Sequence, residues 1–97
     1  MSEKIEITAF IQAVPGKAEH LKQAIIELIE KTLEEPGCEI FKVFQAHDDQ
    51  EQFVLWEIFT NQAALQEHMA KDYTKKYFSL DLTASTKGTR HVQLSKA

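Results

Sequence analysis

Hydrophobic and polar residues alternate along residues 4–13, and this alternation predicts a β-strand. The apolar positions are Ile5, Ile7, Ala9, Ile11 and Ala13. A period of two with β-branched residues is typical of a strand with one buried face. Pro15-Gly16 follows and should end the strand in a turn.

From residue 17 to residue 35 the spacing of apolar residues changes to three and four, which predicts an amphipathic helix. Its buried stripe consists of Leu21, Ala24, Ile25, Leu28, Ile29 and Thr32. Pro36-Gly37 marks the expected end of this helix.

Two further strands are predicted over residues 39–46 and 52–59, joined by a polar hairpin connection at Asp48-Asp49-Gln50. In the second of them both faces are apolar. One face carries Phe53, Leu55 and Phe59, and the other carries Val54, Trp56 and Ile58. A strand of this kind belongs in the middle of a sheet that is covered on both sides.

A second helix is predicted after Thr60 or Asn61, either of which can cap it. Its inner face carries Ala64, Leu65, His68 and Met69. The pattern falters around residues 70–72, and a further helical segment follows with Tyr73, Tyr77 and Phe78. We expect residues 84–88 to form a polar loop and residues 89–94 to form the last strand.

The resulting order, β-α-β-β-α-β, predicts a single ferredoxin-like α+β domain over residues 1–97 with an antiparallel sheet. Its helices should cover one face of the sheet. Burying the apolar residues Val54, Trp56 and Ile58 on the other face would stabilise association by about 1.5–3 kcal/mol each, before the costs of association. We therefore expect a homodimer with the sheets packed face to face.

Composition narrows the functional classes. The chain has 97 residues, a net charge of −4 and no long basic cluster, which argues against a nucleic-acid partner. No apolar run approaches the roughly 20 residues that span a bilayer, and one cysteine allows no internal disulfide. Cytoplasmic residence is the expectation that fits. His20, His47 and His91 lie far apart along the chain, so no metal site is expected.

His68 is the main candidate for chemistry, because it places an imidazole, which titrates near neutral pH, on the apolar side of a short helix. The alternative is a core histidine satisfied by a backbone carbonyl or by Glu57. Glu57 shares a strand face with Phe53 and Leu55, and we expect it to pair with Arg90 or to orient His68. Cys38 lies between a helix and a strand, where a packing role is expected.

Several short segments, in this order and at these intervals, resemble the antibiotic biosynthesis monooxygenase family of small dimeric α+β barrels. The resemblance runs from about Ile5 to Leu94. The segments are Pro15-Gly16-Lys17, Glu35-Pro36-Gly37-Cys38, Asp48-Asp49, the strand residues Phe53, Leu55 and Glu57, and Ala64-Leu65 with His68-Met69.

The resemblance implies an oxygenase that uses neither metal nor flavin and acts on quinols, anthrones or similar electron-rich aromatics. No cofactor is therefore expected. His68 would take the substrate proton as the catalytic base. Substrate contacts are expected from two tyrosines that orient oxygen atoms and from three aromatic residues that form apolar walls: Tyr73, Tyr77, Trp56, Phe59 and Phe78.

Three other functions remain open from the sequence. The same pocket and base would suit an isomerase acting on a small carbonyl metabolite. A module that binds a hydrophobic small molecule without turnover would also fit, as would a structural dimer domain. Oxygen consumption with a panel of quinols would separate the first function from the others.

Overall fold

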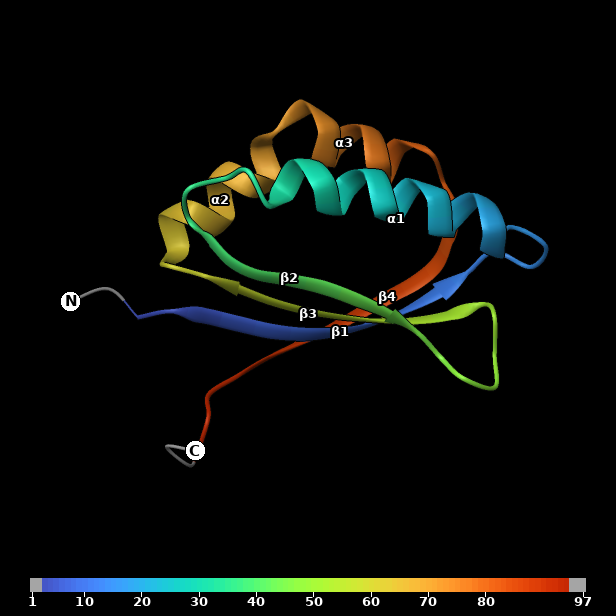
Figure 1. Ribbon diagram of the computed structural model, residues 1–97, viewed down its shortest axis with the longest axis horizontal. Helices are drawn as coiled ribbons and strands as arrows, with labels where there is room; N and C mark the ends of the chain where they lie inside the picture. The colour runs from blue at the N-terminus through green and yellow to red at the C-terminus, as the bar shows by residue number, and fades with distance from the viewer. Residues whose placement is uncertain (1–2, 95–97) are drawn as a thin grey trace.

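The computed structural model describes residues 3–94 as a four-stranded antiparallel sheet with three helices on one face (Figure 1). The strands are β1 (Ile5–Ala13), β2 (Cys38–Gln45), β3 (Gln52–Phe59) and β4 (Thr83–His91). The helices are α1 (Ala18–Thr32), α2 (Gln62–Ala70) and α3 (Asp72–Ser79). Residues 1–2 and 95–97 of the predicted domain lie outside the described range.

The strands are ordered β2-β3-β1-β4, so β3 and β1 occupy the centre of the sheet. β1 pairs with β3 from Ile5↔Phe59 to Gln12↔Gln52, and β2 pairs with the other edge of β3. The central position of β3 agrees with its two apolar faces. The predicted ferredoxin-like α+β fold is confirmed.

The core lies between the sheet and α1. Leu21, Ile25 and Leu28 of α1 are buried against the strands, and Phe53 and Phe59 of β3 meet them from the sheet. Each such side chain contributes about 1.5–3 kcal/mol when it leaves water. This core fixes the helix layer above the central strands and so sets the space between them.

The helices differ slightly from their predicted limits. α1 ends at Thr32, three residues before Glu35, and turns connect it to β2. Asn61 caps α2, because its Oδ1 accepts a hydrogen bond from the backbone N–H of Ala64 at 2.9 Å. Extended backbone at Lys71 separates α2 from α3. None of the helices within residues 3–94 is long and apolar enough to cross a membrane.

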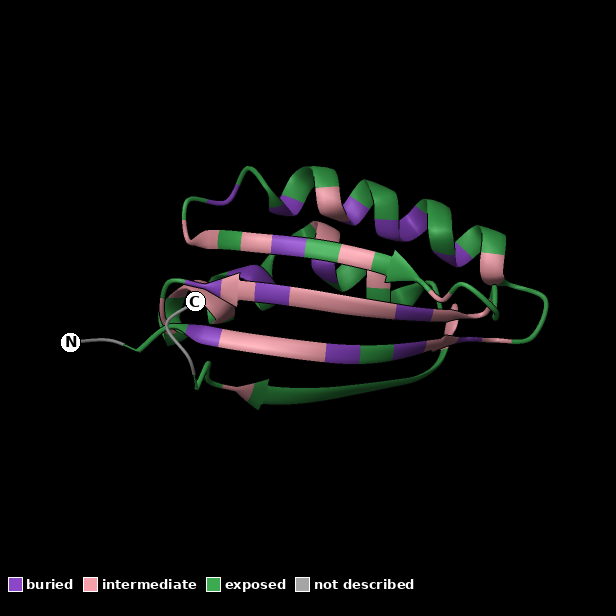
Figure 2. Cartoon of the chain, turned by 60° about the horizontal axis from the view of Figure 1, so that its bottom comes forward, coloured by how far each residue is buried: buried purple, intermediate pink, exposed green. Residues whose placement is uncertain are grey.

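The prediction for the C-terminal segment is wrong. Residues 84–88 do not form a loop, because they belong to β4, which pairs with β1 from Glu6↔His91 to Ala13↔Thr83. The strand is polar on both faces and exposed over most of its length, as the edge strand beside β1 in Figure 2 shows. β4 is therefore a strand because it pairs with β1, and its sequence lacks the hydrophobic alternation that would have predicted it.

The sheet face away from the helices carries a mixed surface. Phe10 and Phe44 are each 53% exposed there and flank Val54 of β3. Trp56 lies two residues further along β3 on the same face, and its indole N–H donates to Glu6 Oε2 at 2.8 Å. We call this side the open face. Its aromatic content is high for a surface in contact with water.

Candidate functional site

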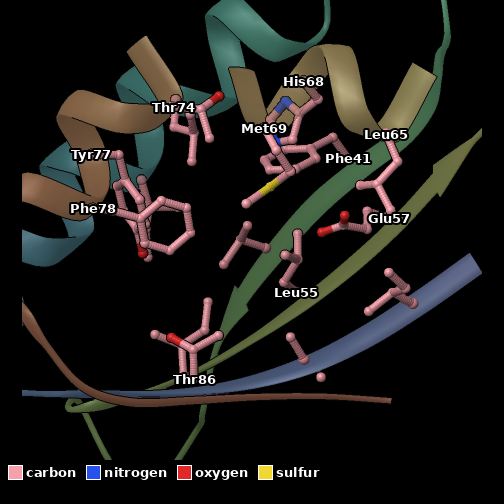
Figure 3. Close-up of a pocket in the computed structure, with 17 residues that line it drawn as sticks. Phe41, Leu55, Glu57, Leu65, His68, Met69, Thr74, Tyr77, Phe78 and Thr86 are labelled. Atoms are coloured by element: carbon pink, nitrogen blue, oxygen red, sulfur yellow. The ribbon is translucent and has the colours of Figure 1, made fainter. Parts of the chain in front are cut away.

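A cavity of about 330 Å³ lies between the sheet and the helices, and we call it the helix-side cavity (Figure 3). Its size falls in the range of small-molecule sites. Every helix and strand contributes to its wall. The lining is mostly hydrocarbon, and its polar side chains are Glu57, His68, Thr74, Tyr77 and Thr86.

His68 of α2 lines this cavity and is only 4% exposed. Its Nδ1 lies 2.9 Å from Oε2 of Glu35, and the side chains of both residues are almost fully buried. A carboxylate can only accept, so Nδ1 carries the hydrogen and Nε2 is left as the acceptor in the neutral ring. Among residues 3–94, Nε2 has no hydrogen-bond partner. The imidazole is therefore prepared to take a proton from a molecule in the cavity.

The turn before β2 explains how Glu35 reaches His68. A side chain at Gly37 would place its Cβ 2.4 Å from the Cβ of Ala64, which is closer than real atoms approach. Glycine therefore allows α2 to pack directly on the turn. The backbone N–H of Thr60 also donates to the Gly37 carbonyl at 2.9 Å. This close approach brings His68, one helical turn after Ala64, beside the carboxylate.

Glu35 also accepts a hydrogen bond from the hydroxyl of Tyr73 on α3. Burial, and then the neighbouring Glu35 carboxylate, raise the pKa of Tyr73 well above its usual range. The tyrosine thus stays protonated and serves as a donor. Two donors on one buried carboxylate lower the cost of removing its charge from water. No role for Glu35 could be predicted from the sequence, because its partners lie 33 and 38 residues further along the chain.

Glu57 of β3 lies on the wall of the same cavity and is 7% exposed. Burial raises its pKa to about 7. It does not have the expected partners, because His68 is bonded to Glu35 and Arg90 lies 3.6 Å from Glu3. Within residues 3–94 its carboxyl group has no hydrogen bond or ion pair. A buried carboxyl group without a partner is uncommon and points to a role in binding or chemistry.

The structure brings together only some of the expected substrate contacts. Tyr77 and Phe78 of α3 line the cavity beside His68 (Figure 3). Phe59 is fully buried and packs on the His68 ring, with ring centroids 5.0 Å apart. Tyr73 is bonded to Glu35, and Trp56 lies on the open face.

Two other titratable candidates, Cys38 and Tyr77, hold their protons because burial raises their pKa values. Burial raises the pKa of Cys38 to about 11, so its thiol stays protonated at neutral pH. Burial likewise raises the pKa of Tyr77 to about 12, which keeps its hydroxyl a donor. Within residues 3–94, no three His, Cys, Asp or Glu side chains are grouped closely enough to hold a metal ion. The cavity thus combines a base, a neutral phenol and an unpaired carboxyl group.

Solved structures with the same fold match this chain over almost its whole length. The protein PA3566 from Pseudomonas aeruginosa is 26% identical, with a TM-score of 0.90 and 98% of each chain covered. The protein SO0527 from Shewanella oneidensis is 29% identical, with a TM-score of 0.85 and coverage of 96% of this chain and 93% of that one. A conserved protein from Methanosarcina mazei is 27% identical, with a TM-score of 0.82 and coverage of 93% and 92%.

A search of curated proteins finds no match to this chain. The family model described as antibiotic biosynthesis monooxygenase matches residues 5–80. That range runs from the first residue of β1 past the end of α3, and it contains Glu35, Gly37, Glu57 and His68. The chain belongs to the antibiotic biosynthesis monooxygenase family.

Proposed function

We propose that this protein is a monooxygenase that oxidises a small electron-rich aromatic of the quinol or anthrone type with O2, without flavin or metal. The observation that supports this most is the His68 imidazole on the wall of a carbon-lined cavity, with Nδ1 held by the buried carboxylate of Glu35. A group in this setting is oriented before substrate arrives, which is what a catalytic base requires.

The proposed chemistry uses the reducing power of the substrate itself. His68 Nε2 takes a proton from a phenol or an anthrone carbon, and the resulting anion gives one electron to O2. The substrate radical and superoxide then combine to form a carbon–oxygen bond. Breakdown of the peroxide leaves a carbonyl on the product and releases the second oxygen atom as water. The hydrocarbon walls favour these steps because they keep solvent away from the anion and the radical.

Each residue has a role that follows from its position. Glu35 and Tyr73 position His68, because the carboxylate fixes the ring tautomer and the tyrosine hydroxyl bonds to the same oxygen. Tyr77 and Phe78 form the wall contributed by α3, with the Tyr77 hydroxyl available to orient a substrate oxygen. Phe59 supports the ring of His68 from behind.

The proposal includes a homodimer formed by the open faces of two sheets. Phe10, Phe44 and Trp56 make this face rich in aromatic area, and a second copy would remove that area from water. Trp56 then has an interface role in this proposal and no contact with substrate.

Oxygen uptake with a panel of quinols and anthrones tests the proposed function. The wild-type protein should consume one O2 per carbonyl product, faster than the substrate oxidises in buffer. His68→Asn should lower the rate by about 10²- to 10⁴-fold, since it removes the base. The matched control is His20→Asn, which changes an exposed histidine in the first turn of α1 and should leave the rate unchanged. Uptake no faster than in buffer, or a His68→Asn rate equal to wild type, would contradict the proposal.

An isomerase acting on a small carbonyl metabolite is the second candidate. The observation in its favour is Glu57, because an acid and a base in one cavity are what enolisation needs. Such an enzyme would exchange substrate hydrogen with deuterated solvent and would consume no oxygen.

A further inference from the structure

We propose that Glu57 is a second catalytic residue of the helix-side cavity, which donates a hydrogen bond to the substrate oxygen that gains negative charge. This inference rests on the proposed function, because it assigns the acid that complements the base His68. It also predicts a substrate feature. The ligand must carry an acceptor oxygen at the Glu57 end of the cavity.

Glu57 faces the cavity from the helix-covered side of β3. Alternation along the strand places it between Leu55 and Phe59 on the helix-covered face, opposite Phe41 on β2 and Ile7 on β1. Figure 3 shows its oxygens directed into the cavity, below the side of the cavity where His68 lies. A carboxyl group walled by hydrocarbon side chains loses most of its hydration, and a missing protein partner makes that loss costly. A ligand oxygen can supply that hydrogen bond.

The protonation of Glu57 agrees with a donor role. Burial raises its pKa to about 7, so a large share of the carboxyl group holds its proton near neutral pH. Four titratable or charged groups face Glu57 from the elements around it: His68 on α2 and Tyr77 on α3 line the same cavity, Cys38 on β2 interacts with it electrostatically, and Arg90 on β4 shares its face of the sheet across Ile7. None of these bonds to Glu57, and Arg90 is directed to Glu3.

The proton balance closes over one turnover of an anthrone-type carbon. His68 takes the first C–H proton and becomes imidazolium. Glu57 keeps its proton and hydrogen-bonds to the carbonyl oxygen, which takes up part of the charge of the carbanion. After the carbanion gives an electron to O2 and the two radicals combine, the imidazolium returns its proton to the peroxide anion. His68 then removes the second C–H proton while the O–O bond breaks, forming the carbonyl. The departing hydroxide takes that proton from the imidazolium and leaves as water, so both residues return to their initial states.

A non-reacting ligand tests the hydrogen bond without turnover. We would use 9-fluorenone with a ¹³C label in its carbonyl group, which is a flat aromatic ketone that does not titrate. The infrared carbonyl stretch of the bound ligand reports hydrogen-bond donation. In the wild-type protein at about pH 5.5 the band should lie at the lower, hydrogen-bonded frequency. At about pH 8.5 it should return toward the unbonded value, and affinity should fall about tenfold.

Two substitutions identify the donor. Glu57→Gln keeps an N–H donor that does not titrate, so the band and the affinity should become independent of pH. Glu57→Met removes the donor, so the band should stay at the unbonded frequency, and kcat/KM for a reactive anthrone should fall about 10²-fold. Glu19→Gln on the exposed side of α1 is the matched control and should behave like wild type.

Several results would overturn the inference. They are an unchanged band in Glu57→Met, a band lost in Tyr77→Phe but retained in Glu57→Met, or failure of 9-fluorenone to bind the wild-type protein. The two proposals fail separately. If Glu57→Met oxidises anthrones as fast as wild type, the oxygenase stands and the acid role of Glu57 falls. If the wild-type protein consumes no oxygen while the band behaves as expected, the oxygenase falls and the hydrogen bond from Glu57 stands.

Discussion

Each face of the sheet carries a histidine close to a glutamate, and the two pairs differ in burial. On the helix side, His68 and Glu35 are 2.9 Å apart with side chains 5% and 7% exposed. On the open face, His91 and Glu6 are 4.0 Å apart with side chains 36% and 22% exposed. Each glutamate also accepts a hydrogen bond from an aromatic residue, Tyr73 in the first case and Trp56 in the second.

The comparison shows that the surroundings decide what a pair of the same residue types can do. In a single protomer, water screens the pair on the open face, so its interaction is weak and the groups are free to rearrange. Hydrocarbon surrounds the pair on the helix side, where a polar atom that loses its partner costs more free energy than in water. The buried glutamate accepts from both donors at Oε2, and the histidine nitrogen that remains faces a cavity. Only this pair is arranged for proton transfer.

Replacing Glu35 and Glu6 separately by alanine should give the largest difference in the free energy of unfolding. Glu35→Ala leaves the Nδ1 of His68 and the hydroxyl of Tyr73 without their buried acceptor, so the free energy of unfolding should fall by about 3–5 kcal/mol. Glu6→Ala breaks partly exposed contacts and should cost about 1 kcal/mol or less when both substitutions are compared in a Phe10→Lys background that disrupts the proposed dimer. Urea unfolding of both variants measures the difference. Equal losses would mean that burial does not distinguish the two pairs.

Glu57 offers a test of the helix-side environment through pH. Its pKa is raised from 4.5 to about 7, so the folded state holds this proton more tightly than the unfolded chain. Its contribution to stability is therefore complete below about pH 4.5 and is lost as pH rises to about 7. Across that window the wild-type protein should lose on the order of 3 kcal/mol relative to Glu57→Gln. Unfolding curves of the two proteins at about pH 4.5 and pH 7.5 give this difference, and parallel pH profiles would contradict it.

Substitutions on the open face should weaken the association of two protomers, whereas substitutions on the helix side should not. Phe10→Lys places a charge in the proposed dimer interface and removes apolar contact worth about 1.5–3 kcal/mol per side chain. Sedimentation equilibrium should show a dissociation constant raised by at least about tenfold. Leu33→Lys is the matched control, because Leu33 is similarly exposed at 56% but lies at the end of α1. A monomeric wild-type protein would contradict the interface.

Much of the fold could be predicted from the sequence because most elements bury one regular stripe. The alternation of β1 and the helical spacing of α1 each follow from burial of Ile11 or Leu21 against the same core. β4 could not be predicted in this way, since it is polar on both faces and owes its form to the free edge of β1. Pairing with a neighbouring strand leaves no periodic signature in the chain.

The candidate site could be predicted only in part, because some of its contacts join residues that are far apart in the chain. His68 was apparent because an imidazole on an apolar helix face is unusual, and Glu57 because it shares a face with apolar residues. The role of Glu35 could not be predicted, because its contact with His68 spans 33 residues of the chain. Its signal was an acidic residue directly before Pro36-Gly37, at a turn where the missing side chain of Gly37 admits a neighbouring helix.

A crystal structure with a phenol or quinol soaked into the protein tests the central claim most directly. The account predicts planar density in the cavity between the sheet and α2–α3, with a ligand oxygen within hydrogen-bond distance of His68 Nε2. Density confined to the open face, or a cavity filled by the side chains of Tyr77 and Phe78 with the imidazole turned away, would contradict it.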